Sequence, residues 1–154
     1  MLKPILLVED NPNDIELALV ALEKSNLANE VVVVRDGADA LDYLHRRGAW
    51  TNRMSGNPAV VLLDLKMPRV DGLEVLREMR ATPDLKNIPT VMLTTSREQR
   101  DLSTSYEQGV NAYVVKPIDF REFIRVIADL GMFWALVNEP PPGSVKLSRV
   151  LRED

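Results

Sequence analysis

Acidic, hydroxyl and ammonium side chains follow four of the five short apolar segments of this chain. In chain order these residues are Glu9, Asp10, Asp64, Thr94 and Lys116. Three carboxylates held close together repel one another, so some stay protonated unless a cation neutralises them. Mg²⁺ suits that role because it prefers oxygen ligands and binds through one or two carboxylates plus phosphate oxygens. A lysine and a threonine hydroxyl would then contact a transferring phosphoryl group, so the pattern indicates phosphoryl transfer to a carboxylate.

The segments that would position these residues are short, continuous and apolar. They are Ile5–Val8, Val31–Val34, Val60–Leu63, Thr90–Leu93 and Tyr113–Val115. Continuous runs rich in valine and isoleucine are typical of strands buried on both faces of a parallel sheet. The carboxyl ends of such strands meet at one edge, where open α/β sheets bind ligands. We therefore expect the chemically active residues to lie together at that edge.

Segments with helical periodicity alternate with the apolar runs. Asn11 is placed as the N-cap of the first helix with Pro12 at its first position, and Asp119 as the N-cap of the last. The expected buried positions, helix by helix, are Ile15, Ala18, Leu19 and Leu22; Ala38, Leu41 and Leu44; Leu73, Val75, Leu76 and Met79; Leu102 and Tyr106; and Phe120, Phe123, Ile124, Ile127 and Leu130. This alternation predicts an α/β fold, a (βα)5 doubly wound five-stranded parallel sheet.

Composition restricts the partners and the location of the protein. The 154 residues suit one domain, and a formal net charge of −4 gives no electrostatic reason to bind nucleic acid or anionic lipid. The absence of cysteine excludes disulfides and thiol chemistry. No apolar run approaches the roughly 18 residues of a membrane span, and the N-terminus does not resemble a signal peptide. We expect a cytoplasmic protein that contacts neither membrane nor nucleic acid.

Two segments interrupt the alternation of strands and helices. The first is the long connection 46–58, and the second is the tail that begins after Val137, where Pro140, Pro141 and Pro142 stop the last helix. We divide the chain into a main domain, residues 1–138, and a tail, residues 139–154. We expect the last helix to continue through the apolar residues Met132, Phe133, Trp134, Leu136 and Val137. Apolar residues recur in the tail, so a homodimer with the tail as its arm is expected. The alternative is an unordered tail, with Phe133 and Trp134 closing the core.

Four separated motifs identify a resemblance. VEDNP, DLKMPRVDG, MLTTS and AYVVKP occur in this order, and with them residues 3 to about 130 resemble the receiver domain of bacterial response regulators, which have a flavodoxin-like fold. The resemblance implies that Asp64 is the phosphoacceptor. It also implies a Mg²⁺ site formed by Asp10, Asp64 and the Lys66 backbone carbonyl, with Glu9 reaching the ion through water.

The same resemblance assigns roles to the remaining motif residues. Lys116 would pair with the phosphate, Thr94 would turn toward the phosphoryl oxygens, and Tyr113 would be the aromatic switch residue. A cis peptide bond between Lys116 and Pro117 is also implied. Thr95 departs from the family pattern, which usually has a small residue at that position. Tyr113 read by itself is equally an ordinary half-buried core residue.

A narrower resemblance points to single-domain regulators paired with phytochrome histidine kinases. It rests on the long connection 46–58, the Thr94-Thr95-Ser96 sequence and the Phe133-Trp134 pair. We expect a stand-alone phosphoacceptor protein that is not an enzyme but assists its own phosphorylation and dephosphorylation. Its partner would be a sensor histidine kinase, with a bacterial phytochrome as one candidate.

Three alternative functions remain at this point. The protein could pass its phosphoryl group onward in a phosphorelay, or it could be a receiver-like module that is never phosphorylated. A haloacid-dehalogenase-type phosphatase also uses an aspartyl nucleophile, but Lys66 stands where that class has a second aspartate. His45 is expected to be a solvated surface residue. Arg46, Arg47 and Arg53 are either a docking patch or an ordinary solvated loop.

Overall fold

Five parallel strands form a single sheet in the order β2-β1-β3-β4-β5. The computed structural model describes residues 2–25 and 27–139. The strands are β1 Ile5–Val8, β2 Val31–Val34, β3 Val60–Leu63, β4 Thr90–Thr94 and β5 Ala112–Val115. The predicted α/β architecture is confirmed, with β4 and β5 each one residue longer than expected. The order places β1 beside β3, and the connections after these two strands run to opposite sides of the sheet. Open α/β sheets usually bind ligands at the strand ends beside such a point.

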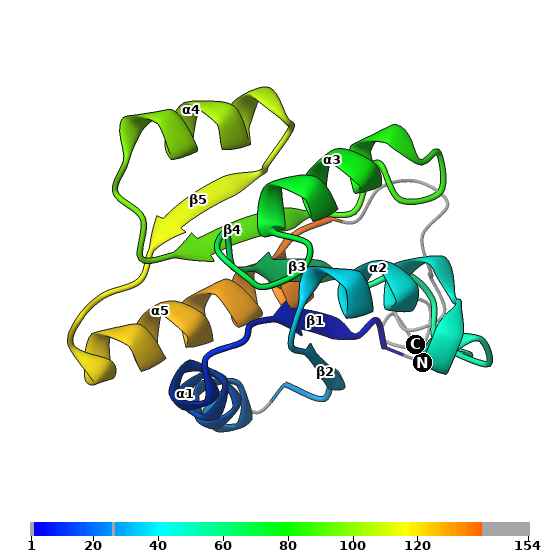
Figure 1. Cartoon of the computed structure of the whole chain (residues 1–154). Coiled ribbons are helices and arrows are strands. Elements are labelled where there is room, and N and C mark those ends of the chain that lie inside the picture. The colour runs from blue at the N-terminus through cyan, green and yellow to red at the C-terminus, as the bar shows by residue number, and fades with distance from the viewer. Residues whose placement is uncertain (1, 26, 140–154) are drawn as a thin grey trace.

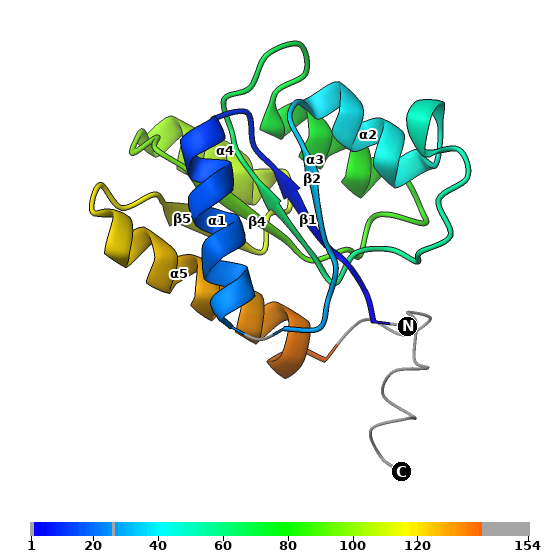
Figure 2. The ribbon, with the colours of Figure 1, turned by 90° about the horizontal axis from the view of Figure 1, so that it is seen from below.

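Helices cover both faces of the sheet (Figures 1 and 2). They are α1 Pro12–Lys24, α2 Gly37–His45, α3 Gly72–Ala81, α4 Gln99–Glu107 and α5 Phe120–Met132. Figure 2 shows α1 and α5 side by side on one face, while α2, α3 and α4 lie on the other. Side-chain caps fix where four of the helices begin, because Asn11, Asp36, Asp71 and Asp119 each accept a hydrogen bond from a first-turn amide.

Two apolar clusters fill the space between the sheet and its helices. One joins alternate strand residues to α2 and α3, and the other joins the opposite strand residues to α1 and α5. Outside α4, most expected core positions are buried, but Leu19 and Phe120 are exposed, with Phe120 58% exposed. Four further positions are only half-buried: Ala38, Leu73, Ile124 and Leu130. Ala21 takes the buried place beside Leu22 because the inward stripe of α1 is turned slightly from the expected one.

Helix α4 differs most from the expectation. Leu102 is only half-buried and Tyr106 is 52% exposed, whereas Asp101 and Ser105 face inward. The inward groups find hydrogen bonds close by, since Ser96 Oγ lies 2.6 Å from Asp101 Oδ2 and Ser105 Oγ donates to the Asp101 carbonyl at 2.8 Å. Neither apolar cluster of the described residues includes an α4 side chain. Polar contacts therefore position this helix.

The long connection 46–58 is ordered by Arg53. The Arg53 guanidinium stacks 4.2 Å from the centre of the Tyr43 ring, and its Nε donates to the Tyr43 carbonyl at 3.0 Å. This residue is therefore a structural contact and not part of a free docking patch. The expectation for His45 was also wrong, because the ring is half-buried and its Nε2 lies 2.8 Å from Glu78 Oε2 on α3.

The last helix continues beyond α5 into η2, Phe133–Val137, as the apolar run predicted. Trp134 packs against the cluster under α1 and α5, while Met132, Phe133, Leu136 and Val137 stay exposed. The tail from residue 140 onward lies outside the described residues. None of the helices described is long and apolar enough to cross a membrane.

The cis bond expected before Pro117 is not observed. Every peptide bond in the described residues is trans, including the bond between Lys116 and Pro117. The trans form is intrinsically favoured even before proline, by about 0.5–1 kcal/mol.

Candidate phosphoacceptor and metal site

Asp64 lies directly beyond the end of the central strand β3. Its main-chain amide donates to the Val8 carbonyl of β1 at 3.0 Å, which ties the residue to the neighbouring strand. Gly72 allows α3 to begin close behind it, because a Cβ at Gly72 would lie 2.3 Å from the Asp64 carbonyl oxygen. The Asp64 residue is 8% exposed, so its carboxylate lies in a nearly closed environment that opens toward the strand ends.

Two further carboxylates meet Asp64 from the end of β1. Oxygen atoms of Glu9, Asp10 and Asp64 lie within 4.8 Å of one another. Glu9 is 2% exposed, and its Oε2 accepts a hydrogen bond from the Asn11 amide at 3.1 Å. The chain ends of β1 and β3 therefore bring the three acids together at one point.

Lys116 completes the cluster from the end of β5. Its amide donates to the Thr94 carbonyl at 2.7 Å, which holds the backbone beside β4. Its Nζ lies 2.5 Å from Glu9 Oε1, 2.9 Å from Asp14 Oδ2 and 3.6 Å from Asp64 Oδ2. A single ammonium group thus faces three carboxylates in the structure.

Burial sets the protonation behaviour of the cluster. Burial raises the pKa of Glu9 to about 7, against the hydrogen bond from Lys116, and the Asp64 charge adds to the rise. Burial also raises the pKa of Asp64, and the positive charge of Lys116 opposes that rise. For Lys116, burial lowers the pKa, but hydrogen bonds to Glu9 and Asp14 outweigh it and the net pKa is raised.

The residues expected to switch lie beside the acid cluster and meet at Ser96. Thr94 is fully buried, and its Oγ1 accepts a hydrogen bond from the Ser96 amide at 3.2 Å. The Tyr113 hydroxyl donates to the Ser96 carbonyl at 3.1 Å. Burial raises the pKa of Tyr113, so the phenol stays protonated as this donor. Thr95, the residue that departs from the family pattern, is exposed to solvent.

Sequence reasoning missed two residues of this region, Asp14 and Asp101. Asp14 is an acid in the first turn of a helix, where it serves equally well as a partner of the helix dipole. Asp101 accepts from Ser96 and lies 3.7 Å from Lys66 Nζ, so it joins α4 to the loop that follows Asp64. The packing of α1 beside the sheet brings the Asp14 carboxylate to Lys116, which is 102 residues away in the chain.

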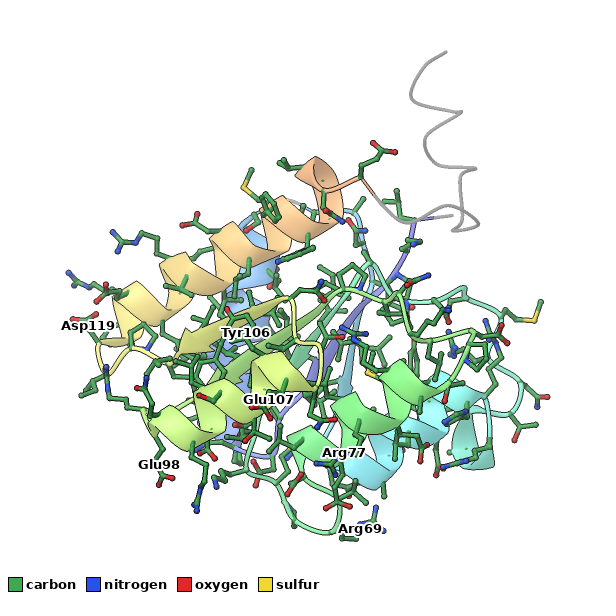
Figure 3. All side chains as sticks on the ribbon, turned by 90° about the horizontal axis from the view of Figure 1, so that it is seen from above. Arg69, Arg77, Glu98, Tyr106, Glu107 and Asp119 are labelled. Atoms are coloured by element: carbon green, nitrogen blue, oxygen red, sulfur yellow. The ribbon has the colours of Figure 1, made fainter. Side chains whose placement is uncertain are left out.

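The edge of the sheet that carries the cluster is also the edge at which α1 to α5 begin, because each of these helices follows a parallel strand. Figure 3 shows Glu98 at the start of α4, Asp119 at the start of α5 and Arg69 in the loop before α3, all along that edge. The oxygen-only donor set of Glu9, Asp10 and Asp64 fits a hard divalent cation such as Mg²⁺ or Mn²⁺. The arrangement can therefore hold a cation beside a carboxylate and a lysine.

Residues 5–128 match the family of response regulator receiver domains. The chain belongs to this family. It is 40% identical to the response regulator Rcp1 of a Synechocystis species over 132 residues, which cover 86% of this chain and 88% of Rcp1. The narrower resemblance to phytochrome response regulators is also confirmed by similarity to the solved structures below.

Solved structures of phytochrome response regulators are similar to this chain in both sequence and fold. The bacteriophytochrome response regulator RtBRR is 63% identical, with a TM-score of 0.74 and coverage of 99% of this chain and 92% of the other. The phosphorylated cyanobacterial phytochrome response regulator RcpA is 40% identical, with a TM-score of 0.86 and coverage of 92% and 99%. Rcp1 has also been solved in a Mn²⁺-bound form, which aligns with a TM-score of 0.84.

Proposed function

We propose that this protein is a stand-alone response regulator that accepts a phosphoryl group on Asp64 from a sensor histidine kinase. The observation that carries the proposal is the position of Asp64. It ends the central strand with its carboxylate beside two other acids and 3.6 Å from the Lys116 ammonium. The carboxylates can bind a cation, and the lysine can neutralise charge on a phosphoryl group that is transferred to the buried Asp64 oxygen.

The proposed step is an in-line displacement at phosphorus. An Asp64 carboxylate oxygen forms the new P–O bond while the P–N bond to the phosphohistidine of the kinase breaks, and the imidazole nitrogen keeps the electron pair. Lys116 then neutralises part of the charge on the phosphoryl oxygens. Thr94 is the last residue of β4, and its buried hydroxyl would donate to one of these oxygens.

Mg²⁺ is the proposed cofactor. Asp10, Asp64 and the Lys66 carbonyl would hold it directly, and Glu9 would contact it through water. The ion would neutralise negative charge on the acids and on the incoming phosphoryl group. The three-acid cluster supports the proposal, as does the Mn²⁺-bound form of the related Rcp1.

Phosphorylation would change the conformation of the protein and so its contacts with other proteins. When Thr94 turns toward the phosphoryl group, its hydrogen bond with the Ser96 amide would break, and Tyr113 would follow because it bonds to the same loop. In this proposal residues 1–138 are the receiver and residues 139–154 an arm for a homodimer. The kinase partner would be a bacterial phytochrome, by similarity to RtBRR.

Transfer of labelled phosphate tests the phosphoacceptor directly. The full chain would be incubated with Mg²⁺ and a small phosphodonor such as acetyl phosphate, and then with candidate histidine kinases. Asp64→Asn should abolish labelling, whereas Asp84→Asn, an exposed acid in the loop after α3, should label like the wild type. Stoichiometric labelling of Asp64→Asn would overturn the assignment. Turnover of simple phosphate esters would favour a phosphatase instead.

A further inference from the structure

Asp14 is a third carboxylate on Lys116 that none of the sequence motifs uses. It lies in the first turn of α1, with its Oδ2 2.9 Å from Lys116 Nζ and its side chain 24% exposed. Its own amide donates to the side chain of the N-cap Asn11 at 3.1 Å, which fixes Asp14 within the first turn of the helix. The contact is therefore built into the start of α1.

The hydrogen bonds of the ammonium group are unevenly divided among the acids. A lysine has three N–H donors. Glu9 and Asp14 accept from Nζ at 2.5 and 2.9 Å, whereas Asp64 stands at 3.6 Å, beyond hydrogen-bond length. Two carboxylates on the β1–α1 side thus draw Lys116 away from the carboxylate proposed to react.

We propose that Asp14 is a positioning residue that holds Lys116 off Asp64 until a phosphoryl group arrives. This inference rests on the proposed function of Asp64. Without a donor hydrogen bond from Lys116, the Asp64 oxygens keep their lone pairs available for attack on phosphorus. Once the phosphoryl group is present, Nζ must move toward its oxygens and give up the Asp14 contact, so Asp14 sets how tightly the phosphorylated state is held.

Asp14 suits this adjustable role better than Glu9. Glu9 is buried, accepts a second hydrogen bond from Asn11 and belongs to the three-acid cluster. Asp14 is partly exposed, and Lys116 is the one side chain within the described residues that bonds to its carboxylate. Its loss removes a competitor for Lys116 and leaves the cluster itself intact.

Binding of beryllium trifluoride, a stable analogue of a phosphoryl group on a carboxylate, measures this competition. The full chain with Mg²⁺ would be titrated and the bound fluorine quantified by ¹⁹F NMR. Asp14→Asn keeps the size of the side chain and removes its charge, and should tighten binding about fivefold, the scale of a partly exposed ion pair. Asp14→Glu restores the charge and should return the affinity toward the wild type.

The matched control is Glu16→Gln on the same helix. Glu16 is exposed, and the change removes the same charge without touching Lys116. If Glu16→Gln and Asp14→Asn increase the affinity for beryllium trifluoride equally, the cause is the change in net charge, and the proposal is overturned. Unchanged or weaker binding by Asp14→Asn would overturn it as well. If the wild type itself binds no analogue with Mg²⁺ present, the proposed function fails, and this inference fails with it.

Discussion

At the scale of single residues, the acid cluster works against the stability of the fold. Glu9 and Asp64 are both buried, and burial of a carboxylate disfavours its charged form. Lys116 compensates only in part, because it is one cation among three acids at hydrogen-bond or ion-pair distance. The site proposed for a cation and a phosphoryl group therefore carries excess negative charge of its own.

This excess charge predicts a pH dependence of stability. The pKa of Glu9 is raised from 4.5 to about 7, so the folded state binds its proton more tightly than the unfolded chain. The resulting stability is fully present below about pH 4.5 and is lost as the pH rises through about 7. In a chelator, urea unfolding should show the wild type losing on the order of 3 kcal/mol more than Glu9→Gln between pH 4.5 and 8.

Two comparisons make that measurement decisive. Glu16→Gln, an exposed acid on α1, should keep the wild-type pH dependence. Adding Mg²⁺ at pH 8 should restore stability to the wild type, because the ion binds the ionised cluster only in the folded chain. Equal pH dependence in the wild type and in Glu9→Gln would contradict the assignment.

Substitutions can test the proposed metal ligands one at a time. The few protein ligands at this site predict weak Mg²⁺ binding without phosphate, because the ion dehydrates reluctantly. Asp10→Ala should remove most of the affinity measured by calorimetry. Glu9→Ala should remove less, since Glu9 would act through water and its Oε1 is engaged by Lys116. Wild-type affinity in Asp10→Ala would show that the ligand assignment is wrong.

At the scale of secondary-structure elements, the sequence predicted the strands well and the helix faces unevenly. Continuous Val and Ile runs gave all five strands within one residue, because burial on both faces leaves a simple signal. The prediction of the buried face of α4 was wrong because its two large apolar residues, Leu102 and Tyr106, suggested an apolar inward face. Asp101 and Ser105 turn inward instead, where Ser96 and the helix backbone satisfy them, and no periodicity of apolar residues can indicate that.

Arg80 at the end of α3 joins three elements through its guanidinium. Its nitrogen atoms donate to three carbonyls and one side-chain amide, those of Gly109, Lys86, Ile88 and Asn111. These contacts close the loops before β4 and before β5. The Arg80 side chain is half-buried, and this burial lowers the pKa of its guanidinium.

Replacing Arg80 should lower the stability of the fold. Arg80→Ala removes four hydrogen bonds and takes the Arg80 donor from the Gly109 and Lys86 carbonyls, so it should lower the free energy of unfolding by about 2 kcal/mol. Arg77→Ala, on the exposed side of the same helix (Figure 3), should change it by less than about 0.5 kcal/mol. Urea unfolding of both variants checks this, and similar losses in the two would show that the Arg80 contacts contribute little.

At the scale of the whole molecule, topology decided what the sequence could reveal of the site. The rule that parallel strands share one carboxyl edge was enough to predict that Glu9, Asp64 and Lys116 lie together. It could not predict which acid Lys116 contacts most closely, because that depends on the packing of α1 beside the sheet. The same packing places Asp14 beside Lys116.

The end of the last helix supports the proposed homodimer. Met132 at the end of α5 and Phe133, Leu136 and Val137 in η2 are exposed, while Trp134 packs against the core. An exposed apolar group of this size at one end of the molecule is typical of an interaction surface. A second copy could cover it and also receive the apolar residues of the tail in a closed two-fold arrangement.

Sedimentation at micromolar concentration tests the dimer and the part that the tail plays in it. The full chain should sediment as a dimer, and a chain ending at Asn138 should sediment as a monomer because it lacks the arm. Phe133→Ser should also weaken the full-length dimer, since it removes an exposed aromatic from the proposed contact. If the full chain and the shortened chain both sediment as monomers, the dimer proposal is wrong. If both sediment as dimers, the contact lies on another face and the tail is not its cause.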